Sequence, residues 1–263
     1  MNRNDISEII QGMAARLIAR SPAGVGLCLI GGFRHRLLDE GCRRSVDLDY
    51  HWAGDLEAKR DEIEGLLRAR LLPEIRRCLG HDGDVRRSTG PDADSPFVKT
   101  VEVAAYKVGV PGSRIEVPID ITNIPCLDRP IMKTMDGVGY LSVSDADMVE
   151  GKVLAFFLRH RIEARDIVDV YFFSSALLPE SAIRFREKAA RRALREDALR
   201  AGLRDMIQAR ERLVRAIGGI LDEQVDSPVA EQVQKAGGAG MVFDDVVDRV
   251  RALVGQPPDK EPA

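Results

Sequence analysis

The chain has 263 residues, of which 44% are hydrophobic and 31% are charged, and its formal net charge is −3. This composition is typical of a globular protein and excludes a globally disordered chain. No apolar run approaches the roughly 20 residues that span a bilayer, so no membrane segment is expected. The N-terminal residues lead into an amphipathic helix rather than a secretory signal, which makes the cytoplasm the expected location.

The first half of the chain combines strand patterns with helix patterns. Hydrophobic periodicity and turn residues predict, in chain order, helix 5–19, strand 25–30, helix 33–40, strand 45–52, helix 55–79, strand 82–88, a loop over 92–96, and a hairpin of strands 98–108 and 114–123. Pro118 lies in the second hairpin strand and lacks an N–H, so an edge position or a local bulge is expected there.

From about Ser144 the pattern is helical throughout. The predicted helices are 145–160, 163–178, 181–217 and 242–254, with a flexible glycine-rich connection at 235–240. The expected fold class is therefore α+β, with an N-terminal mixed sheet and flanking helices followed by a C-terminal helical bundle. The expected domains are 1–143 and 144–255, with a flexible tail over 256–263.

Cysteine and histidine residues give no sign of a zinc site. The four cysteines (Cys28, Cys42, Cys78 and Cys126) are scattered, without a Cys-x-x-Cys pair or a histidine at metal-ligand spacing. Reduced structural thiols are the expected state in the cytoplasm.

The acids of the predicted strand 45–52 are candidates for metal binding. Asp47 and Asp49 are two positions apart, so on a strand both side chains would leave the same face about 6.6 Å apart. Without a cation, two such carboxylates would repel each other. Gly31–Gly32 follows the preceding strand, and a turn without Cβ atoms lets a phosphate approach the backbone closely. This combination indicates a metal site that handles a nucleoside triphosphate.

A third acid is expected from a neighbouring strand, because transfer to a hydroxyl needs a base or a second metal ligand. Asp120, near the end of strand 114–123, is the first choice. Glu116 lies on the same predicted face and is its rival.

The chain resembles the AbiEii/AbiGii-type nucleotidyltransferases, the toxins of type IV toxin–antitoxin systems, which have a polymerase-β-like fold. The family's Gly-Gly-Thr-Ala-Leu-Arg-Leu-Leu segment corresponds to Gly31-Gly32-Phe33-Arg34-His35-Arg36-Leu37-Leu38. Its Arg-Phe-Ser-x-Asp-Leu-Asp block corresponds to Arg43-Arg44-Ser45-Val46-Asp47-Leu48-Asp49 at the same separation. The chain departs from the family at Phe33, which replaces a small hydroxyl residue beside the expected phosphates.

A second block is also similar to the family. Glu150-Gly151-Lys152-Val153-Leu154-Ala155, followed by Arg161 to Tyr171, is similar to its Glu-Lys-Leu-x-Ala … Lys-Ala-Arg-Asp-x-Tyr-Asp-Leu motif. Asp166 shares a helical stripe with core residues and needs a partner, for which Lys152 is the candidate. This is either a structural ion pair or, as the resemblance implies, a pair in which Lys152 contacts the phosphates and Asp166 orients it or the acceptor.

Arginines are concentrated after Pro179. Between residues 180 and 217, eleven Lys/Arg residues face six Asp/Glu residues, a local charge of +5. A solvated helix face with intrahelical ion pairs is one interpretation. An RNA-binding face over 184–215 is the other, although no aromatic residue is interleaved for base stacking.

These observations predict a Mg²⁺-dependent nucleotidyltransferase toxin that moves a nucleotide from an NTP to an acceptor hydroxyl, with RNA or tRNA as acceptor and a cognate antitoxin as partner. The resemblance implies nucleotide binding by Gly31, Gly32, Arg36, Ser45 and Lys152. One or two metal ions are expected on Asp47, Asp49 and Asp120, with Lys152 and Asp166 completing the catalytic set. The alternatives are a small-molecule acceptor, as in aminoglycoside nucleotidyltransferases, and an inactive protein of the same fold that binds nucleotide or a partner, for which Phe33 is the main argument.

Overall fold

The computed structural model describes residues 3–89 and 95–255 of the chain. Most of the predicted loop at 92–96 and the whole predicted tail at 256–263 lie outside these residues. Within the described part, no helix is both long enough and apolar enough to span a membrane.

The chain divides into two compact units, which we describe separately. The first comprises the residues up to Ile124 together with Pro130–Val143. The second comprises Pro125–Arg129 and the residues from Ser144 onward. A short segment that precedes the last two strands of the first unit therefore belongs to the second.

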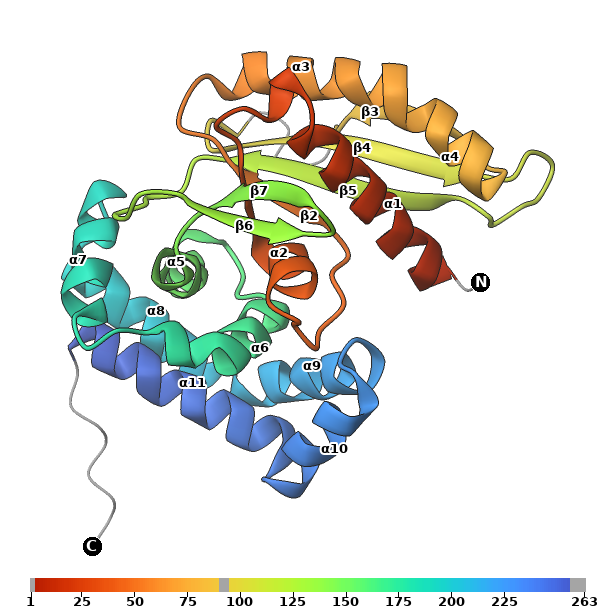
Figure 1. Cartoon of the computed structure of the whole chain (residues 1–263). Helices are drawn as coiled ribbons and strands as arrows, with labels where there is room; N and C mark the ends of the chain where they lie inside the picture. The colour runs from red at the N-terminus through yellow and green to blue at the C-terminus, as the bar shows by residue number, and fades with distance from the viewer. Residues whose placement is uncertain (1–2, 90–94, 256–263) are drawn as a thin grey trace, which may run out of the picture. The chain divides into compact units, whose positions relative to one another are not determined.

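The first unit is a sheet with helices (Figure 1). Its elements are α1 (Arg3–Ala19), a 3-10 turn (Pro22–Gly24), β1 (Cys28–Ile30), α2 (Gly31–Leu38), β2 (Leu48–His51), α3 (Leu56–Leu66), a π-helical turn (Leu67–Leu71), α4 (Leu72–Leu79), β3 (Asp82–Arg87), β4 (Val98–Tyr106), β5 (Ile115–Thr122), β6 (Ile131–Met135) and β7 (Val138–Ser142). The region from α3 to α4 corresponds to the predicted helix 55–79. It begins where the Asp55 carboxylate accepts the N–H groups of Glu57 and Ala58.

The seven strands form one mixed sheet in the order β3-β4-β5-β2-β1-β7-β6. The β2–β5 and β1–β7 pairs are parallel and the other pairs are antiparallel. The sheet and the flanking helices confirm the expected fold class.

The two faces of the central strands differ in character. On one face the alternate residues of β2 and β5 are fully buried, as in Leu48 and Ile119, and α1, α3 and α4 cover this face (Figure 1). The opposite face carries a row of half-buried polar residues, which we call the polar strip: Asp49, His51, Thr100, Asp120 and Thr122. Alternation along strands separates the apolar core from this polar face.

The expected strand 45–52 is shorter in the structure. β2 begins at Leu48, and Val46, which would lie on the opposite side of the expected strand from Asp47 and Asp49, is 50% exposed. Two backbone carbonyls before β2 are hydrogen-bonded without a neighbouring strand. The side-chain amide of the buried Gln11 on α1 donates to the Ser45 carbonyl at 3.2 Å and to the Asp47 carbonyl at 3.3 Å. A long-range side-chain contact thus replaces ladder hydrogen bonds.

Pro118 lies on an inner strand rather than at the edge of the sheet. It is opposite Glu102 of β4, and β2 begins to pair with β5 one residue later, at Leu48 opposite Ile119. Proline has no N–H to donate, and Pro118 lies just before the stretch of β5 that pairs with β2.

The β6–β7 hairpin was not predicted. Its turn is Asp136-Gly137, and both residues have a positive φ, of 50° and 71°. This is the backbone of a tight two-residue hairpin turn, for which Asp-Gly is a favoured sequence. The dipeptide was a signal that could have located the hairpin.

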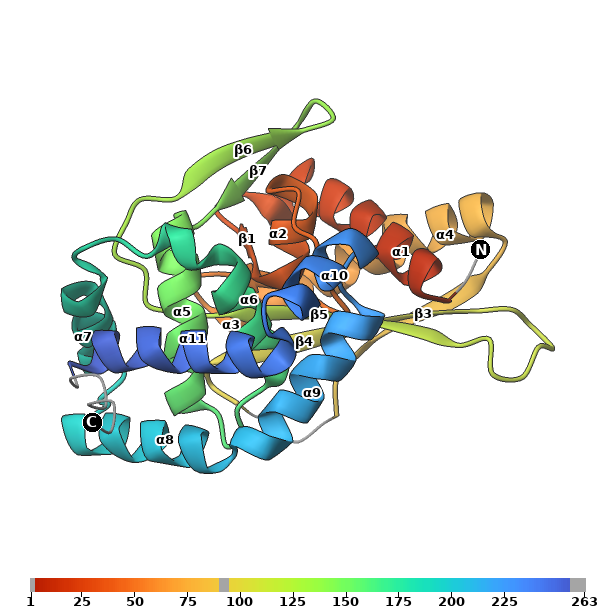
Figure 2. The ribbon, with the colours of Figure 1, turned by 90° about the horizontal axis from the view of Figure 1, so that it is seen from below.

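The second unit is helical, as expected. Its elements are α5 (Asp145–Leu158), α6 (Ala164–Phe173), a 3-10 turn (Ser174–Ala176), α7 (Ser181–Arg191), α8 (Glu196–Gln208), α9 (Arg210–Glu223), α10 (Ser227–Lys235) and α11 (Gly238–Val254). Figure 2 shows α11 beside α8, and buried residues such as Val246 and Leu203 lie along these helices.

Two predictions for this unit were wrong. The helix expected over 181–217 is three helices, because the chain turns at Ala193, which has a φ of 55°, and again at Ala209. The connection expected at 235–240 is not an open linker, because α11 already begins at Gly238. Neither break in the 181–217 segment carries glycine or proline, so its sequence reads as continuous helix.

Candidate functional site

The glycine turn lies where β1 passes into α2. Gly31 is the first residue of α2 and has a φ of +77°, and the residue before the helix, Ile30, offers no side-chain cap. The first backbone N–H groups of a helix point along its axis and can donate hydrogen bonds to an anion. Helix α2 thus starts two residues earlier than the predicted 33–40, at the glycines themselves.

A buried ion cluster holds α2 in place. Arg34, with 0% exposure, donates to the Ser142 hydroxyl of β7 at 3.0 Å and pairs with Asp39. Lys133 of β6 pairs with the same carboxylate. Burial acts to raise the pKa of Asp39, but the hydrogen bonds from His35 and Lys133 and the charge of Arg34 outweigh it and lower that pKa. The glycine turn is therefore attached to the sheet through charged contacts.

The loop before β2 brings two polar groups to the glycine turn. A Cβ added at Gly32 would lie 3.0 Å from the Ser45 hydroxyl and 3.2 Å from the Cζ of Arg43. The Ser45 hydroxyl donates to the Asp47 carboxylate at 3.0 Å. Arg43 is buried with 5% exposure, and it was not among the predicted site residues although it opens the Arg-x-Ser-x-Asp-x-Asp block.

Asp49 and Asp120 lie directly opposite each other on the parallel strands β2 and β5. Their side chains are on the same face, since paired residues of neighbouring strands share a face. On β4, the other strand that neighbours β5, Thr100 lies opposite Asp120, and its hydroxyl donates to the Asp120 carboxylate at 2.6 Å. Two carboxylates from distant parts of the sequence are thereby brought together in the polar strip.

The rival acid, Glu116, lies four residues before Asp120 on β5 and is therefore further from Asp49 along the same face. It is opposite Ala104, and its carboxylate accepts hydrogen bonds from Arg114 at 2.9 Å and Arg86 at 3.1 Å. These contacts give Glu116 the surroundings of a surface ion-pair network.

A divalent cation suits the chemistry of this site. Asp49 has its carboxylate against the Gly31 Cα, and no three acid, histidine or cysteine side chains within 3–89 and 95–255 form a ready-made metal cluster. Mg²⁺ does not require such a cage, because it is commonly bound by one or two carboxylates together with substrate phosphates and water. Asp49 and Asp120 provide the two carboxylates, and Asp47 lies one residue before β2.

Phe33 does not have the role expected from the sequence. Its side chain is 2% exposed and belongs to the hydrophobic core of the first unit. The ring therefore packs in the core and does not extend over the glycine turn, which removes the argument for an inactive site.

Arg36 lies in the last turn of α2, about five residues or 7.5 Å from the glycines along the helix. Its guanidinium donates to Glu8 of α1 at 3.0 Å and to the Gly41 carbonyl at 2.9 Å. These contacts are structural, since they join α2 to α1 and to the following loop.

In the second unit, Lys152 and Asp166 form the ion pair that the sequence predicted. Their Nζ and Oδ1 atoms are 2.6 Å apart, and Lys152 also lies 3.2 Å from Asp169. Asp166 and Asp169 are 1% and 2% exposed, and Arg159 contacts Asp166 as well. Helices α5 and α6 are thus joined through buried carboxylates.

A second buried network was not predicted. Lys188 of α7 is fully buried and contacts Asp147 at 2.6 Å and Glu150 at 2.7 Å, both of which have 0% exposure. Arg184 donates to Glu150 at 2.8 Å and to both carboxylate oxygens of Asp128. Arg184 and Lys188 therefore hold the second unit together and do not contribute to an exposed basic face.

The remaining cations of 184–215 are spread over three helices. Several are paired with nearby acids: Arg191 with Glu187, Arg195 with Asp197, Arg200 with Glu196, and Arg210 with Asp244. The segment is thus not the single arginine-rich helix expected from the sequence.

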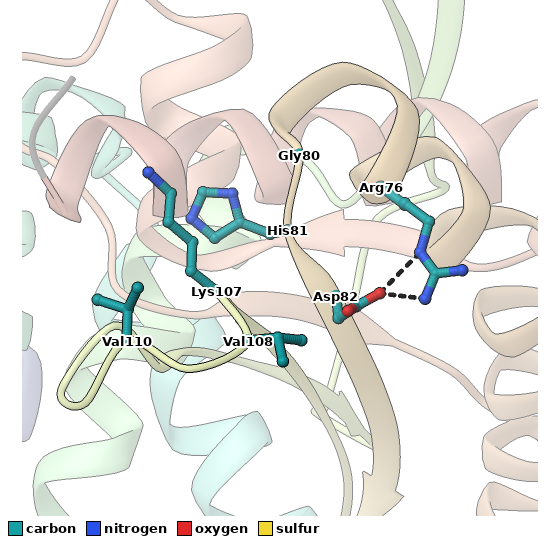
Figure 3. Close-up of a pocket in the computed structure, with 7 residues that line it drawn as sticks. All are labelled: Arg76, Gly80, His81, Asp82, Lys107, Val108 and Val110. Carbon is teal, nitrogen blue, oxygen red and sulfur yellow. Dashed lines mark hydrogen bonds and ion pairs between the residues drawn. The ribbon is translucent and has the colours of Figure 1, made fainter.

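A shallow hollow of about 440 Å³ lies elsewhere in the first unit (Figure 3). It is lined by His81, Lys107 and the Arg76–Asp82 pair, whose Nε and Oδ1 atoms are 2.7 Å apart. Lys107 follows the end of β4, about 23 Å along that strand from Thr100. This hollow is therefore distinct from the polar strip.

Comparison with solved structures shows the same fold in several proteins, two of which are described as nucleotidyltransferases. MenT4, a nucleotidyltransferase toxin of Mycobacterium tuberculosis, aligns with a TM-score of 0.53 and 16% identity over 98% of this chain and 85% of that one. A putative nucleotidyltransferase of Helicobacter pylori gives 0.52 and 15% over 96% and 98%. The JHP933 protein of Helicobacter pylori gives 0.50 and 14% over 96% and 95%.

A search of curated proteins returns no match. The model of a protein family, described as "Nucleotidyl transferase AbiEii toxin, Type IV TA system", matches residues 15–247. That range covers both structural units and includes the glycine turn, the polar strip and the buried ion networks. The chain therefore belongs to the AbiEii family of nucleotidyltransferase toxins.

Proposed function

We propose that this nucleotidyltransferase moves a nucleotide from an NTP to a hydroxyl group of an RNA, with tRNA as the expected acceptor and Mg²⁺ as its metal. The observation that carries the proposal is the position of Asp49 opposite Asp120 and against the Gly31 turn. When bound, Mg²⁺ would neutralise triphosphate charge and orient the α-phosphorus for attack.

The N–H groups at Gly31 and Gly32, with the Ser45 hydroxyl, would bind the outer phosphates of the NTP. Asp49 and Asp120 would hold the metal together with the triphosphate, and Asp47, whose carboxylate accepts the Ser45 hydroxyl, lies two residues before Asp49. The acceptor oxygen forms a bond to the α-phosphorus as the bond to the β-phosphate bridging oxygen breaks, and pyrophosphate leaves. Asp120 would accept the proton of the acceptor hydroxyl.

Lys152 would act on the β- and γ-phosphates, with Asp166 orienting it. The support for this role is the family resemblance of the second block and the Lys152–Asp166 ion pair. The protein would work in the cytoplasm as the toxin of a type IV pair, with a cognate antitoxin as its partner.

A small hydroxylated molecule is a second candidate acceptor. The observation that favours it is the burial of Lys188 and the low exposure of Arg184, because these cations are engaged with acids and not available for phosphate contacts. Binding of an RNA backbone depends on the number of such contacts.

The test is a transfer assay with four α-³²P-labelled NTPs, Mg²⁺, and either bulk tRNA or an aminoglycoside as acceptor. The proposal predicts label on the RNA and loss of labelling when EDTA removes the metal. Label on the aminoglycoside alone would show that the acceptor is a small molecule and not an RNA. Labelling that persists in EDTA would contradict the metal assignment. No label on any acceptor would overturn the proposal.

A further inference from the structure

His51 is a polar residue of the strip to which neither the sequence pattern nor the family resemblance gives a role. It lies two residues after Asp49 on β2, so the two side chains leave the sheet on the same face. Its neighbour on β5 is Thr122, two residues after Asp120. His51 is half-buried, as are the other members of the strip.

The hydrogen bonding of His51 identifies its tautomer. The backbone N–H of Ile124 donates to His51 Nδ1 at 3.2 Å. Because a backbone N–H can only donate, Nδ1 must be the acceptor, and the proton of the neutral ring is therefore on Nε2. The donor of the His51 ring is therefore Nε2–H, and the hydrogen bond from the Ile124 N–H, just after β5, holds the orientation of the ring.

The register of the sheet separates His51 from the glycine turn. β1 and β2 are antiparallel, with Ile30 opposite Asp49 and Cys28 opposite His51. The turn at Gly31 follows Ile30, so it continues β1 away from the His51 end. Along the polar strip, the glycine turn is therefore on one side of Asp49 and His51 is on the other.

In-line transfer gives these two sides different roles. The attacking oxygen and the leaving pyrophosphate lie on opposite sides of the α-phosphorus. Under the proposed function, the outer phosphates lie at Gly31 and Gly32 and the α-phosphorus lies near Asp49. The acceptor then approaches from the side of His51.

We infer that His51 is an acceptor-binding residue, whose Nε2–H donates to an oxygen of the acceptor beside the attacking hydroxyl. This inference rests on the proposed function. His51 would contact the acceptor and not the NTP, so removal of the Nε2–H donor should raise the KM for the acceptor and leave the KM for the NTP unchanged.

Two substitutions separate this role from a structural one. His51→Asn retains an acceptor near the position of Nδ1, for the Ile124 N–H, but lacks the Nε2 donor. His51→Gln retains an N–H donor near the position of Nε2 but lacks the Nδ1 acceptor. Transfer kinetics with bulk tRNA or the aminoglycoside, whichever the wild type labels, are measured together with melting temperature.

For His51→Asn we expect a KM for the acceptor raised about tenfold, an unchanged KM for the NTP and a near wild-type melting temperature. For His51→Gln we expect a lower melting temperature and an acceptor KM closer to that of the wild type. An unchanged acceptor KM in His51→Asn, a rise in the NTP KM alone, or acceptor KM values that follow melting temperature would overturn the inference. A wild-type protein without transfer activity would instead remove the proposed function, and this inference with it.

Discussion

The carboxylate of Asp49 lies against the Cα of Gly31. A Cβ added at Gly31 would lie 2.7 Å from the Asp49 Cγ and 2.9 Å from its Cβ, closer than non-bonded carbon atoms approach. Gly31 also has a φ of +77°, which other residues rarely adopt. The turn and the acid therefore depend on each other, because the glycine leaves the space that the carboxylate fills.

Gly31→Ala should displace Asp49 and lower transfer activity by at least about 100-fold. The left-handed backbone should cost about 1–2 kcal/mol in the free energy of unfolding. Gly137→Ala is the matched control, since Gly137 has a φ of +71° with no atom within 4 Å of an added Cβ. It should show a similar loss of stability at full activity. Equal activities of the two variants in the α-³²P assay would contradict this account of Gly31.

Thr100 is predicted to position Asp120. Its hydroxyl donates to the Asp120 carboxylate at 2.6 Å, and removing that bond frees the carboxylate to rotate. Thr100→Val should reduce kcat about tenfold and raise the Mg²⁺ concentration needed for half-maximal rate, whereas Thr100→Ser should restore both. Thr134→Val, at an exposed position of β6, is the control. A Thr100→Val enzyme with the magnesium dependence of the control would exclude the positioning role.

Lys152 is predicted to stabilise the second unit independently of any catalytic role. Lys152→Met leaves Asp166 and Asp169, which are at most 2% exposed, without one of their cations. Breaking a buried pair in this way should cost about 3–5 kcal/mol in urea unfolding. Replacing both acids by asparagine in the Lys152→Met background should recover much of that loss. Unfolding of Lys152→Met at the urea concentration of the wild type would contradict this stabilising role.

Asp128 provides a prediction for pH. Hydrogen bonds from Arg184 and then Ser144 lower the pKa of Asp128 in the folded protein. Its contribution to stability is therefore fully present above the pKa of the unfolded chain, about 3.9, and is lost as the pH falls through the lower folded value. Asp128→Asn should melt below the wild type at pH 7, and the difference should shrink below about pH 4. A difference that stays constant down to pH 2 would contradict the assignment.

Much of the candidate site follows from local patterns. The glycine pair after an apolar run, and the Asp-x-Asp spacing on an alternating strand, are features of neighbouring residues. The hairpin of β4 and β5 was also predictable, and with it the strand that carries Asp120. That Asp120, and not Glu116, lies opposite Asp49 depends on how β5 pairs with β2, which no local pattern determines.

The parts that could not be predicted depend on long-range contacts. Gln11 lies 36 residues before Asp47 in the sequence, yet its amide replaces the ladder bonds of the expected strand 45–52. Arg184 and Lys188 read as surface charges on an amphipathic helix, but they enter a buried network with acids of α5. The helix break at Ala193 has no glycine or proline signal, since a non-glycine residue adopts the positive φ.

The most direct test of the account compares nucleotide transfer by Asp49→Asn, Asp120→Asn and Glu116→Gln at saturating Mg²⁺. Asparagine keeps the size of each carboxylate and removes its charge, and Glu116 is the matched acid on the same strand. We predict that both asparagine variants lose at least about 100-fold in rate at unchanged melting temperature, and that Glu116→Gln transfers as the wild type does. Wild-type rates in Asp49→Asn or Asp120→Asn would contradict the account.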